Sequence, residues 1–164
     1  MNQGSKTSKP GAKMMKKLGI GILAAWMLMQ AGAAELSWLT DLPNAKVKAK
    51  SENKLVLMDF TGSDWCIWCK RLKQEVLSTP EFIEYANKNL VAVEVDFPRQ
   101  TPQSEELKKA NQALQRAYAI EGYPTIIVLD GEGKKVGTLG YEEGGPKPFI
   151  ARIEALKNKS PAKS

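Results

Sequence analysis

The sequence predicts an α/β fold in which a central mixed β-sheet carries helices on both faces. Two observations favour this class. Apolar runs of strand length alternate along the chain with segments whose apolar residues recur every three or four positions. The last two strand candidates are separated only by the turn sequence DGEG, which predicts a β-hairpin and so an antiparallel pair. Strands that alternate with helices in this way are typical of a sheet layered between helices.

Four strands are expected. The segment KLVLMDFTG is mostly apolar, as is typical of a strand buried on both faces, and LVAVEVD and TIIVL have a similar character. A fourth strand completes the hairpin after DGEG. The expected bounds are Lys54–Gly62, Leu90–Asp96, Thr125–Leu129 and Lys135–Tyr141.

Five helices are expected between and around these strands. Ser78 or Thr79 followed by Pro80 predicts one helix start, and Ser104 predicts another, because these residues favour helix caps and first turns. The helix after Ser104 has an apolar stripe of Leu107, Ala110, Leu114 and Tyr118. The other expected ranges are Ala45–Ser51, Cys66–Leu77, Pro80–Lys88 and Pro146–Lys157.

The first 34 residues are typical of a secretory signal peptide behind a polar leader. Lys16 and Lys17 precede an apolar run, Leu18–Met29, and small residues follow it. Such a run spans about 18 Å as a helix, too short for a bilayer core of about 30 Å. We expect export to a periplasmic or extracellular compartment, with cleavage after Ala33 or Ala34. A buried core helix and an uncleaved membrane anchor are the alternatives.

The net charge of +6 does not indicate a nucleic-acid-binding protein. Residues 1–34 contribute five lysines and no acid, and the remainder carries 19 basic and 18 acidic residues. Binding to phosphate backbones requires a basic surface that this near-neutral remainder does not predict. We therefore expect one domain over residues 35–157, a basic flexible tail over 158–164 and no nucleic-acid partner.

The only two cysteines, Cys66 and Cys69, lie three positions apart in a chain that has no histidine. A structural zinc ion needs four ligands, commonly two such pairs, so zinc would require a second chain or unusual carboxylates. Haem attachment requires a histidine after the second cysteine, where this chain has Lys70. A structural disulfide closing so short a loop stabilises by only about 2 kcal/mol.

A redox centre fits the local pattern best. Cys66 follows a predicted buried strand and begins a predicted helix, whose N–H groups and dipole stabilise a thiolate. The thiolate is the nucleophile of disulfide exchange. Cys69, one turn later, is expected on the core side, and Lys70 and Arg71 add positive charge nearby.

A proline supports this interpretation. In GYPT, Pro124 directly precedes a predicted strand, where a residue without an N–H suits a strand start or a cis turn. An ordinary loop proline is the alternative. Its place between the last predicted crossover helix and the hairpin favours the first interpretation.

In this combination and order, VLMDFTGSDWCIWCK, VAVEVD, GYPTIIVLDGEGK and the final amphipathic helix resemble the thioredoxin family. The resemblance covers nearly all of Ser37–Leu156 and is nearest to exported bacterial members with an FTGSDWC-x-WCK segment. It implies the thioredoxin fold, Cys66 as attacking thiol and Cys69 as resolving thiol. The two residues between the cysteines match neither the Gly-Pro of thioredoxin nor the Pro-His of strong oxidants.

The resemblance also implies roles around the cysteines. Trp65 would flank the active site, Pro124 would be a cis-proline against the sulfurs, and Tyr123 would offer backbone hydrogen bonds to an extended substrate. Ile67 and Trp68 are candidates for a hydrophobic docking surface. Asp59 matches the family's buried acid, a candidate general base for Cys69. The alternative for Asp59 is a strand-end acid satisfied by the backbone, and LVAVEVD offers no lysine to pair with it.

Together these observations predict an exported, monomeric thiol–disulfide oxidoreductase that needs no cofactor beyond the Cys66–Cys69 disulfide. Its expected partners are protein thiol or disulfide substrates and an electron-donor or electron-acceptor protein. Because no histidine is present to stabilise the thiolate, we favour a reductase over an oxidase or isomerase. A thioredoxin-fold binding module with incidental cysteines is the alternative from another class.

Overall fold

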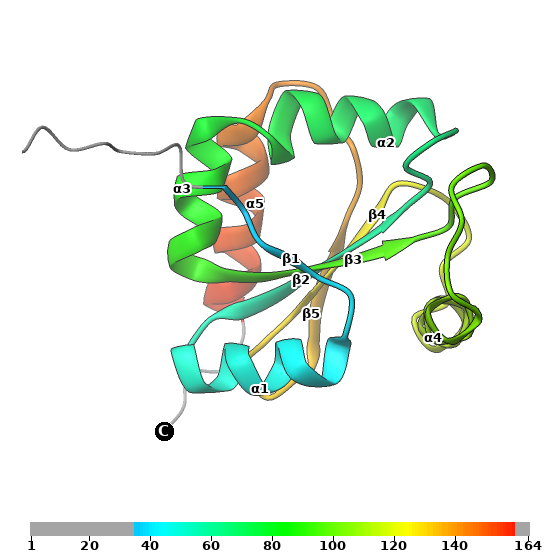
Figure 1. The fold of residues 1–164 in the computed structure, drawn as a ribbon. Coiled ribbons are helices and arrows are strands. Elements are labelled where there is room, and N and C mark those ends of the chain that lie inside the picture. The colour runs from blue at the N-terminus through cyan, green and yellow to red at the C-terminus, as the bar shows by residue number, and fades with distance from the viewer. Residues whose placement is uncertain (1–34, 160–164) are drawn as a thin grey trace, which may run out of the picture. The chain divides into compact units, whose positions relative to one another are not determined.

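The computed structural model describes residues 35–159 (Figure 1). The expected signal peptide and the last residues of the expected tail lie outside this range. The elements are β1 (Trp38–Leu39), α1 (Leu42–Glu52), β2 (Leu55–Thr61), α2 (Ile67–Leu72), η1 (Lys73–Leu77), α3 (Pro80–Asn89), β3 (Leu90–Asp96), α4 (Glu105–Ala117), β4 (Thr125–Leu129), β5 (Lys135–Leu139) and α5 (Pro146–Lys159).

The strands form one mixed sheet in the order β1-β3-β2-β4-β5. The first three strands run parallel to one another, because the chain between β2 and β3 returns through α2, η1 and α3. Strand β4 lies antiparallel to β2, and β5 completes the hairpin with β4. The predicted α/β class, the mixed sheet and the thioredoxin fold are thereby confirmed.

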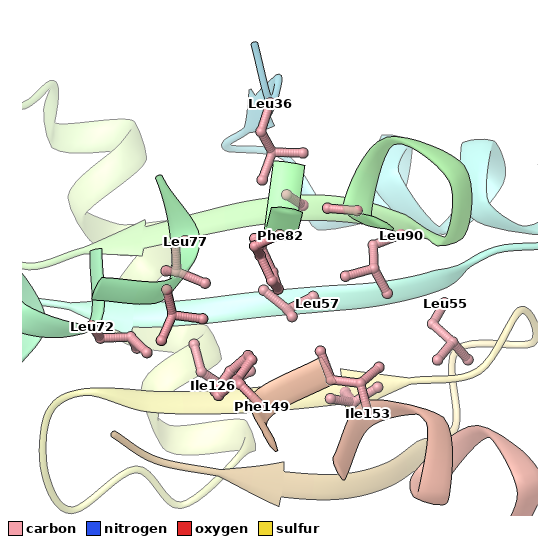
Figure 2. Packing of buried hydrophobic residues seen from close by; sticks show 14 residues of the cluster. Leu36, Leu55, Leu57, Leu72, Leu77, Phe82, Leu90, Ile126, Phe149 and Ile153 are labelled. Carbon is pink, nitrogen blue, oxygen red and sulfur yellow. The ribbon is translucent and has the colours of Figure 1, made fainter. Parts of the chain in front are cut away.

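Alternating side chains of the strands supply two separate cores. On one face, Leu57 and Ile126 pack with residues of α2, η1, α3 and α5, including Phe82 and Phe149 (Figure 2). On the other face, Met58 packs with α1, and parts of α4 lie at the edge of this cluster. All seven residues of β2 are buried, as its apolar sequence predicted.

The N-terminal part of the domain differs from the prediction. Helix α1 begins at Leu42, three residues before the expected Ala45, because Asp41 caps it by accepting a hydrogen bond from the Asn44 N–H at 3.3 Å. A short strand, β1, precedes it and pairs with β3. Two residues are too few to give a periodic signal in sequence.

The predicted helix Cys66–Leu77 is present in two parts. Cys66 lies before the first helical residue and caps α2, and the backbone continues from Lys73 as the π-helical segment η1. The predicted inward residues Cys69, Leu72 and Val76 are buried. The change of helical pitch has no signature in the spacing of the apolar residues.

Two further expectations at helices were wrong. Ala110, expected in the apolar stripe of α4, is exposed, and the buried residue of that helix is Asn111, whose amide donates to the Asp96 carbonyl at 2.9 Å. Helix α5 continues to Lys159, two residues into the stretch expected to be a tail. None of the helices between residues 35 and 159 is long and apolar enough to cross a membrane.

Candidate active site

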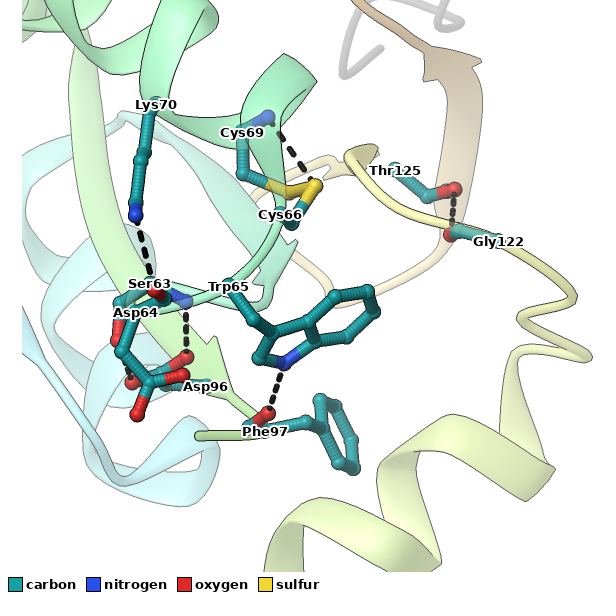
Figure 3. Close-up of a disulfide and its surroundings, with 10 residues drawn as sticks. All are labelled: Ser63, Asp64, Trp65, Cys66, Cys69, Lys70, Asp96, Phe97, Gly122 and Thr125. Atoms are coloured by element: carbon teal, nitrogen blue, oxygen red, sulfur yellow. Dashed lines mark hydrogen bonds between the residues drawn. A yellow bond between two sulfur atoms is a disulfide. The ribbon is translucent and has the colours of Figure 1, made fainter. Parts of the chain in front are cut away.

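Cys66 and Cys69 form a disulfide at the start of α2 (Figure 3). Their Cα atoms are 5.3 Å apart, and both residues are buried. The Cys69 backbone N–H donates to Cys66 Sγ at 3.2 Å, so Cys66 is the N-cap of the helix. An N–H aimed at this sulfur stabilises negative charge on it when the disulfide is reduced.

The turn before Cys66 depends on a glycine. The Cys66 N–H donates to the Gly62 carbonyl at 2.8 Å, which closes the turn. A β-carbon on Gly62 would lie 2.5 Å from Cε2 of the Trp65 indole, closer than real β-carbon contacts. Gly62 is therefore required for Trp65 to fold back over the end of β2.

Trp65 is held in place on several sides. Its indole N–H donates to the Phe97 carbonyl at 2.8 Å (Figure 3). Its ring packs edge-on against the Tyr123 ring, with the two ring centres 5.8 Å apart. The Arg99 guanidinium lies 3.9 Å from the centre of the indole, in cation–π contact. Neither Phe97 nor Arg99 was predicted as a site residue, because each reaches Trp65 only through the loop that follows β3.

That loop is anchored to the active-site turn by carboxylates. Asp64 accepts hydrogen bonds from the backbone N–H groups of Arg99, Gln100 and Thr101 at 2.7–3.2 Å. These bonds favour the ionised carboxylate and lower the pKa of Asp64 to about 2. On the other side of the turn, Asp96 accepts from both the N–H and the hydroxyl of Ser63.

The proline loop lies at the start of β4. The Tyr123–Pro124 peptide is cis, the conformation that the resemblance implied. The Tyr123 side chain is positioned by Gln115 of α4, whose amide donates to the Tyr123 hydroxyl at 2.8 Å. Register places Ile126 opposite Leu139, so the chain leaving β5 runs beside this loop.

The two residues between the cysteines are exposed. Ile67 and Trp68 retain 63% and 50% of their accessible surface. Trp68 lines a cavity of about 400 Å³ together with Tyr123, Pro124, Gly140 and Tyr141. Gly140 and Tyr141 were not predicted as site residues, since they were expected only as the end of a hairpin strand.

Asp59 is buried in β2 on the sheet face that α2 and η1 cover. Its Oδ1 accepts no hydrogen bond from the described residues, which contradicts the alternative that the backbone satisfies this oxygen. Strand register places Glu94 of β3 directly beside Asp59. As expected from its sequence, β3 supplies no lysine to pair with the Asp59 carboxyl group. A positive charge comes instead from Lys73 at the start of η1.

Burial raises the pKa of Asp59 to about 7; the negative charge of Glu94 adds to the increase and Lys73 opposes it. Burial also raises the pKa of Glu94. Asp59 can therefore hold or release a proton near neutral pH, which is the property a proton-transfer residue needs.

The positively charged side chains of Lys70 and Arg71 in α2 contact residues that flank the cysteines. The Lys70 ammonium donates to the Asp64 carbonyl at 2.8 Å (Figure 3), and the Arg71 guanidinium lies 5.2 Å from the centre of the Trp68 ring. Both side chains thus support the residues around the cysteines. Between residues 35 and 159 no group of three or more His, Cys, Asp or Glu side chains is arranged to hold a metal ion.

Comparison with known proteins gives consistent matches. Residues 42–157 match the family model of the thioredoxin-like domain. The disulfide bond reductase DsbH of Chlamydia pneumoniae is 37% identical over 126 residues, which are 76% of this chain and 75% of that protein. The solved structure of a DsbH oxidoreductase superposes with a TM-score of 0.74 at 32% identity, covering 87% of this chain and 96% of that one.

A more distant match is to part of a larger protein. The thiol:disulfide interchange protein DsbD of Klebsiella pneumoniae is 27% identical over 124 residues, 76% of this chain. The matched region is 19% of that protein, so this chain resembles one segment of it.

Proposed function

The chain belongs to the thioredoxin-like family and is a thiol–disulfide oxidoreductase, and from this premise we propose that it reduces disulfides in exported proteins. The observation that carries the proposal is the Cys66–Cys69 disulfide at a helix start, beside an exposed apolar surface. In this proposal the Cys66–Cys69 disulfide is the redox group that reacts with the substrate.

In the proposed cycle the reduced protein reacts first through Cys66. Its thiolate, supported by the Cys69 N–H, attacks one sulfur of the substrate disulfide. A mixed disulfide forms, and the other substrate sulfur leaves as a thiolate that takes up a proton.

Cys69 then completes the reaction. It gives its proton to Asp59, whose raised pKa suits it to act as the base, and its thiolate attacks Cys66 Sγ. The second substrate sulfur leaves as a thiolate that takes up a proton, and the Cys66–Cys69 disulfide forms. Two electrons have passed to the substrate, and a dithiol donor protein must return them.

The charges on this sheet face support the reducing direction. Strong oxidants of this chemistry have a stabilised reduced form with a low thiol pKa. Here the two neighbouring carboxyl groups of Asp59 and Glu94 lie on the face that α2 covers, and in their ionised form they disfavour further negative charge. No histidine lies between the cysteines to offset them.

Two measurements test the proposal. Purified protein with dithiothreitol should accelerate the reduction of insulin disulfides, Cys66→Ser should abolish the acceleration, and Cys69→Ser should accumulate the mixed disulfide. Equal rates for wild type and Cys66→Ser would exclude the enzyme and favour the binding module. The matched exposed control, Val47→Ala, lies on α1 and should retain the wild-type rate.

The reduction potential of the Cys66–Cys69 pair distinguishes a reductase from an oxidase. Equilibration with glutathione or dithiothreitol should give a value near the roughly −270 mV of thioredoxin. A value near −120 mV, typical of a strong oxidant, would instead favour the dithiol oxidase or isomerase.

We further propose that the protein acts after export, as a monomer, on protein clients. The order of residues in the first 34 positions supports export. Mass spectrometry of the mature protein should find a first residue near Ala34 or Glu35. An intact N-terminus in a membrane fraction would identify the segment as an anchor.

A further inference from the structure

The loop between β3 and α4 places a positive charge beside the nucleophile, and the chemistry above does not use it. The Arg99 guanidinium lies 3.9 Å from the centre of the Trp65 indole, and Trp65 directly precedes Cys66. Arg99 is exposed and forms no ion pair with any residue between positions 35 and 159. Its charge is therefore free to meet a carboxylate of another molecule.

The guanidinium is held in position before any client arrives. The Asp64 carboxylate accepts hydrogen bonds from three consecutive backbone N–H groups, those of residues 99–101, at 2.7–3.2 Å. These bonds fix the backbone at Arg99, and the contact with the indole fixes its side chain. A charged group that is already positioned binds a partner with little further loss of conformational freedom.

A second cation lies on the same side of the active-site turn. The Lys70 ammonium donates to the Asp64 backbone carbonyl at 2.8 Å (Figure 3) and pairs with no carboxylate of the described residues. The two cations outnumber the single carboxylate of Asp64, with which both residues form hydrogen bonds. A guanidinium that lies flat on an indole keeps its N–H edge free, and that edge can donate two parallel bonds to a carboxylate.

The position of Trp65 brings this charge next to the path expected for a client. The Trp65 ring packs against the Tyr123 ring, and the backbone at Tyr123 is where an extended client is expected to pair. Residues one or two positions from the client cysteine lie about 3–7 Å from it along an extended chain. A client bound at Cys66 therefore passes Trp65 and the guanidinium stacked on it with the residues that flank its cysteine.

We propose that Arg99, stacked on Trp65, is a specificity-determining residue that binds a carboxylate one or two positions from the reacting cysteine of the client. This inference rests on the proposed function and names the clients that the enzyme prefers, which are disulfides flanked by aspartate or glutamate. Lys70 adds a second positive charge to the same surface. The preference comes from a loop that lies outside the cysteine motif.

The test uses end-blocked pentapeptides with a central cysteine, linked as symmetric disulfides. The first peptide has glutamate at the two positions before the cysteine and glutamine after it, the second has the reverse, and the third has glutamine at all four positions. Initial rates with dithiothreitol as the donor, corrected for the reaction with dithiothreitol alone, give kcat and KM for each. We expect wild type to favour one glutamate peptide over the glutamine peptide by about three- to fivefold in kcat/KM, through a lower KM.

Substitutions assign the preference to Arg99. Arg99→Gln should bring the glutamate-to-glutamine ratio close to one, and Arg116→Gln, which removes an exposed arginine from α4, should leave the ratio unchanged. Arg99→Lys keeps the net charge but has no planar group to stack on the indole, so the ratio should fall about twofold or more. Raising the NaCl concentration from about 0.05 M to about 0.5 M should also reduce the wild-type ratio, because salt screens exposed charges.

The outcomes separate this inference from the function on which it rests. A ratio near one in an active wild type, or equal ratios in wild type and Arg99→Gln, overturns the role of Arg99 and leaves the reductase intact. An unchanged ratio in Arg99→Lys, or an equal loss in Arg116→Gln, would assign the preference to net charge and overturn the proposal. If wild type reduces neither the peptides nor hydroxyethyl disulfide, the proposed function fails and the role of Arg99 fails with it.

Discussion

Asp59 offers the most direct physical test of this site, through the substitution Asp59→Asn in the oxidised protein. The carboxyl group is buried beside Glu94, and its pKa is raised from 3.8 to about 7. The difference of about three pH units corresponds to about 4 kcal/mol, at about 1.4 kcal/mol for each. Asparagine has the same shape and no charge, so the variant removes this cost of ionisation.

Protonation of Asp59 stabilises the native protein relative to the unfolded chain at low pH. Between pH 3.8 and about 7 the native protein keeps a proton on Asp59 that the unfolded chain has released. The stabilisation from this proton is complete below pH 3.8 and is lost as the pH rises through about 7. Wild type should therefore lose about 4 kcal/mol relative to Asp59→Asn between pH 4 and pH 8.

Urea unfolding of both proteins at intervals from pH 4 to pH 8, without reductant, measures the difference in free energy of unfolding. Glu106→Gln, which removes one exposed carboxylate from α4, controls for the change in net charge. A wild-type-minus-variant difference that is flat across this range would refute the inference that burial keeps Asp59 protonated. The same variant should slow release of the mixed disulfide about 100-fold or more, if Asp59 is the base.

Three other substitutions test neighbouring features. Glu94→Gln removes the negative charge beside Asp59, so the midpoint of the pH-dependent stability difference should move to lower pH; an unchanged midpoint would show that the two groups are not coupled. Gly62→Ala forces the Trp65 indole to move and should cost about 1–3 kcal/mol in urea unfolding, with altered tryptophan fluorescence; wild-type values for both would contradict the close packing. Phe82→Ala removes a fully buried ring and should cost about 3–5 kcal/mol in thermal or urea unfolding, whereas a cost below about 1 kcal/mol would contradict its place in the core.

The order of elements could be predicted because its signals are local. The strand over Leu55–Thr61 is a run of apolar residues, and the helices starting at Pro80 and Glu105 follow the capping residues Thr79 and Ser104. Where the signal is too short or absent, prediction was wrong or incomplete. The two-residue strand β1, the π-helical segment η1 and the buried Asn111 are examples.

The disulfide partners could be anticipated for a similar reason. Cys66 and Cys69 are one helical turn apart, and the chain contains no other cysteine. Pro124 stood out because it precedes an apolar strand, although its contact with the site depends on how the strands pair. The roles assigned to these residues in catalysis remain predictions for the assays above.

The sequence by itself determined the fold class, the order of most elements and the cysteine pair, since each depends on neighbours within a few residues. Only the tertiary structure decided what surrounds that pair. Strand register placed Glu94 beside Asp59, the loop after β3 brought Arg99 to Trp65, and the hairpin carried Tyr141 to Trp68. These contacts join residues about 30 to 70 positions apart, and their geometry is set by strand pairing and core packing, which local periodicity does not specify.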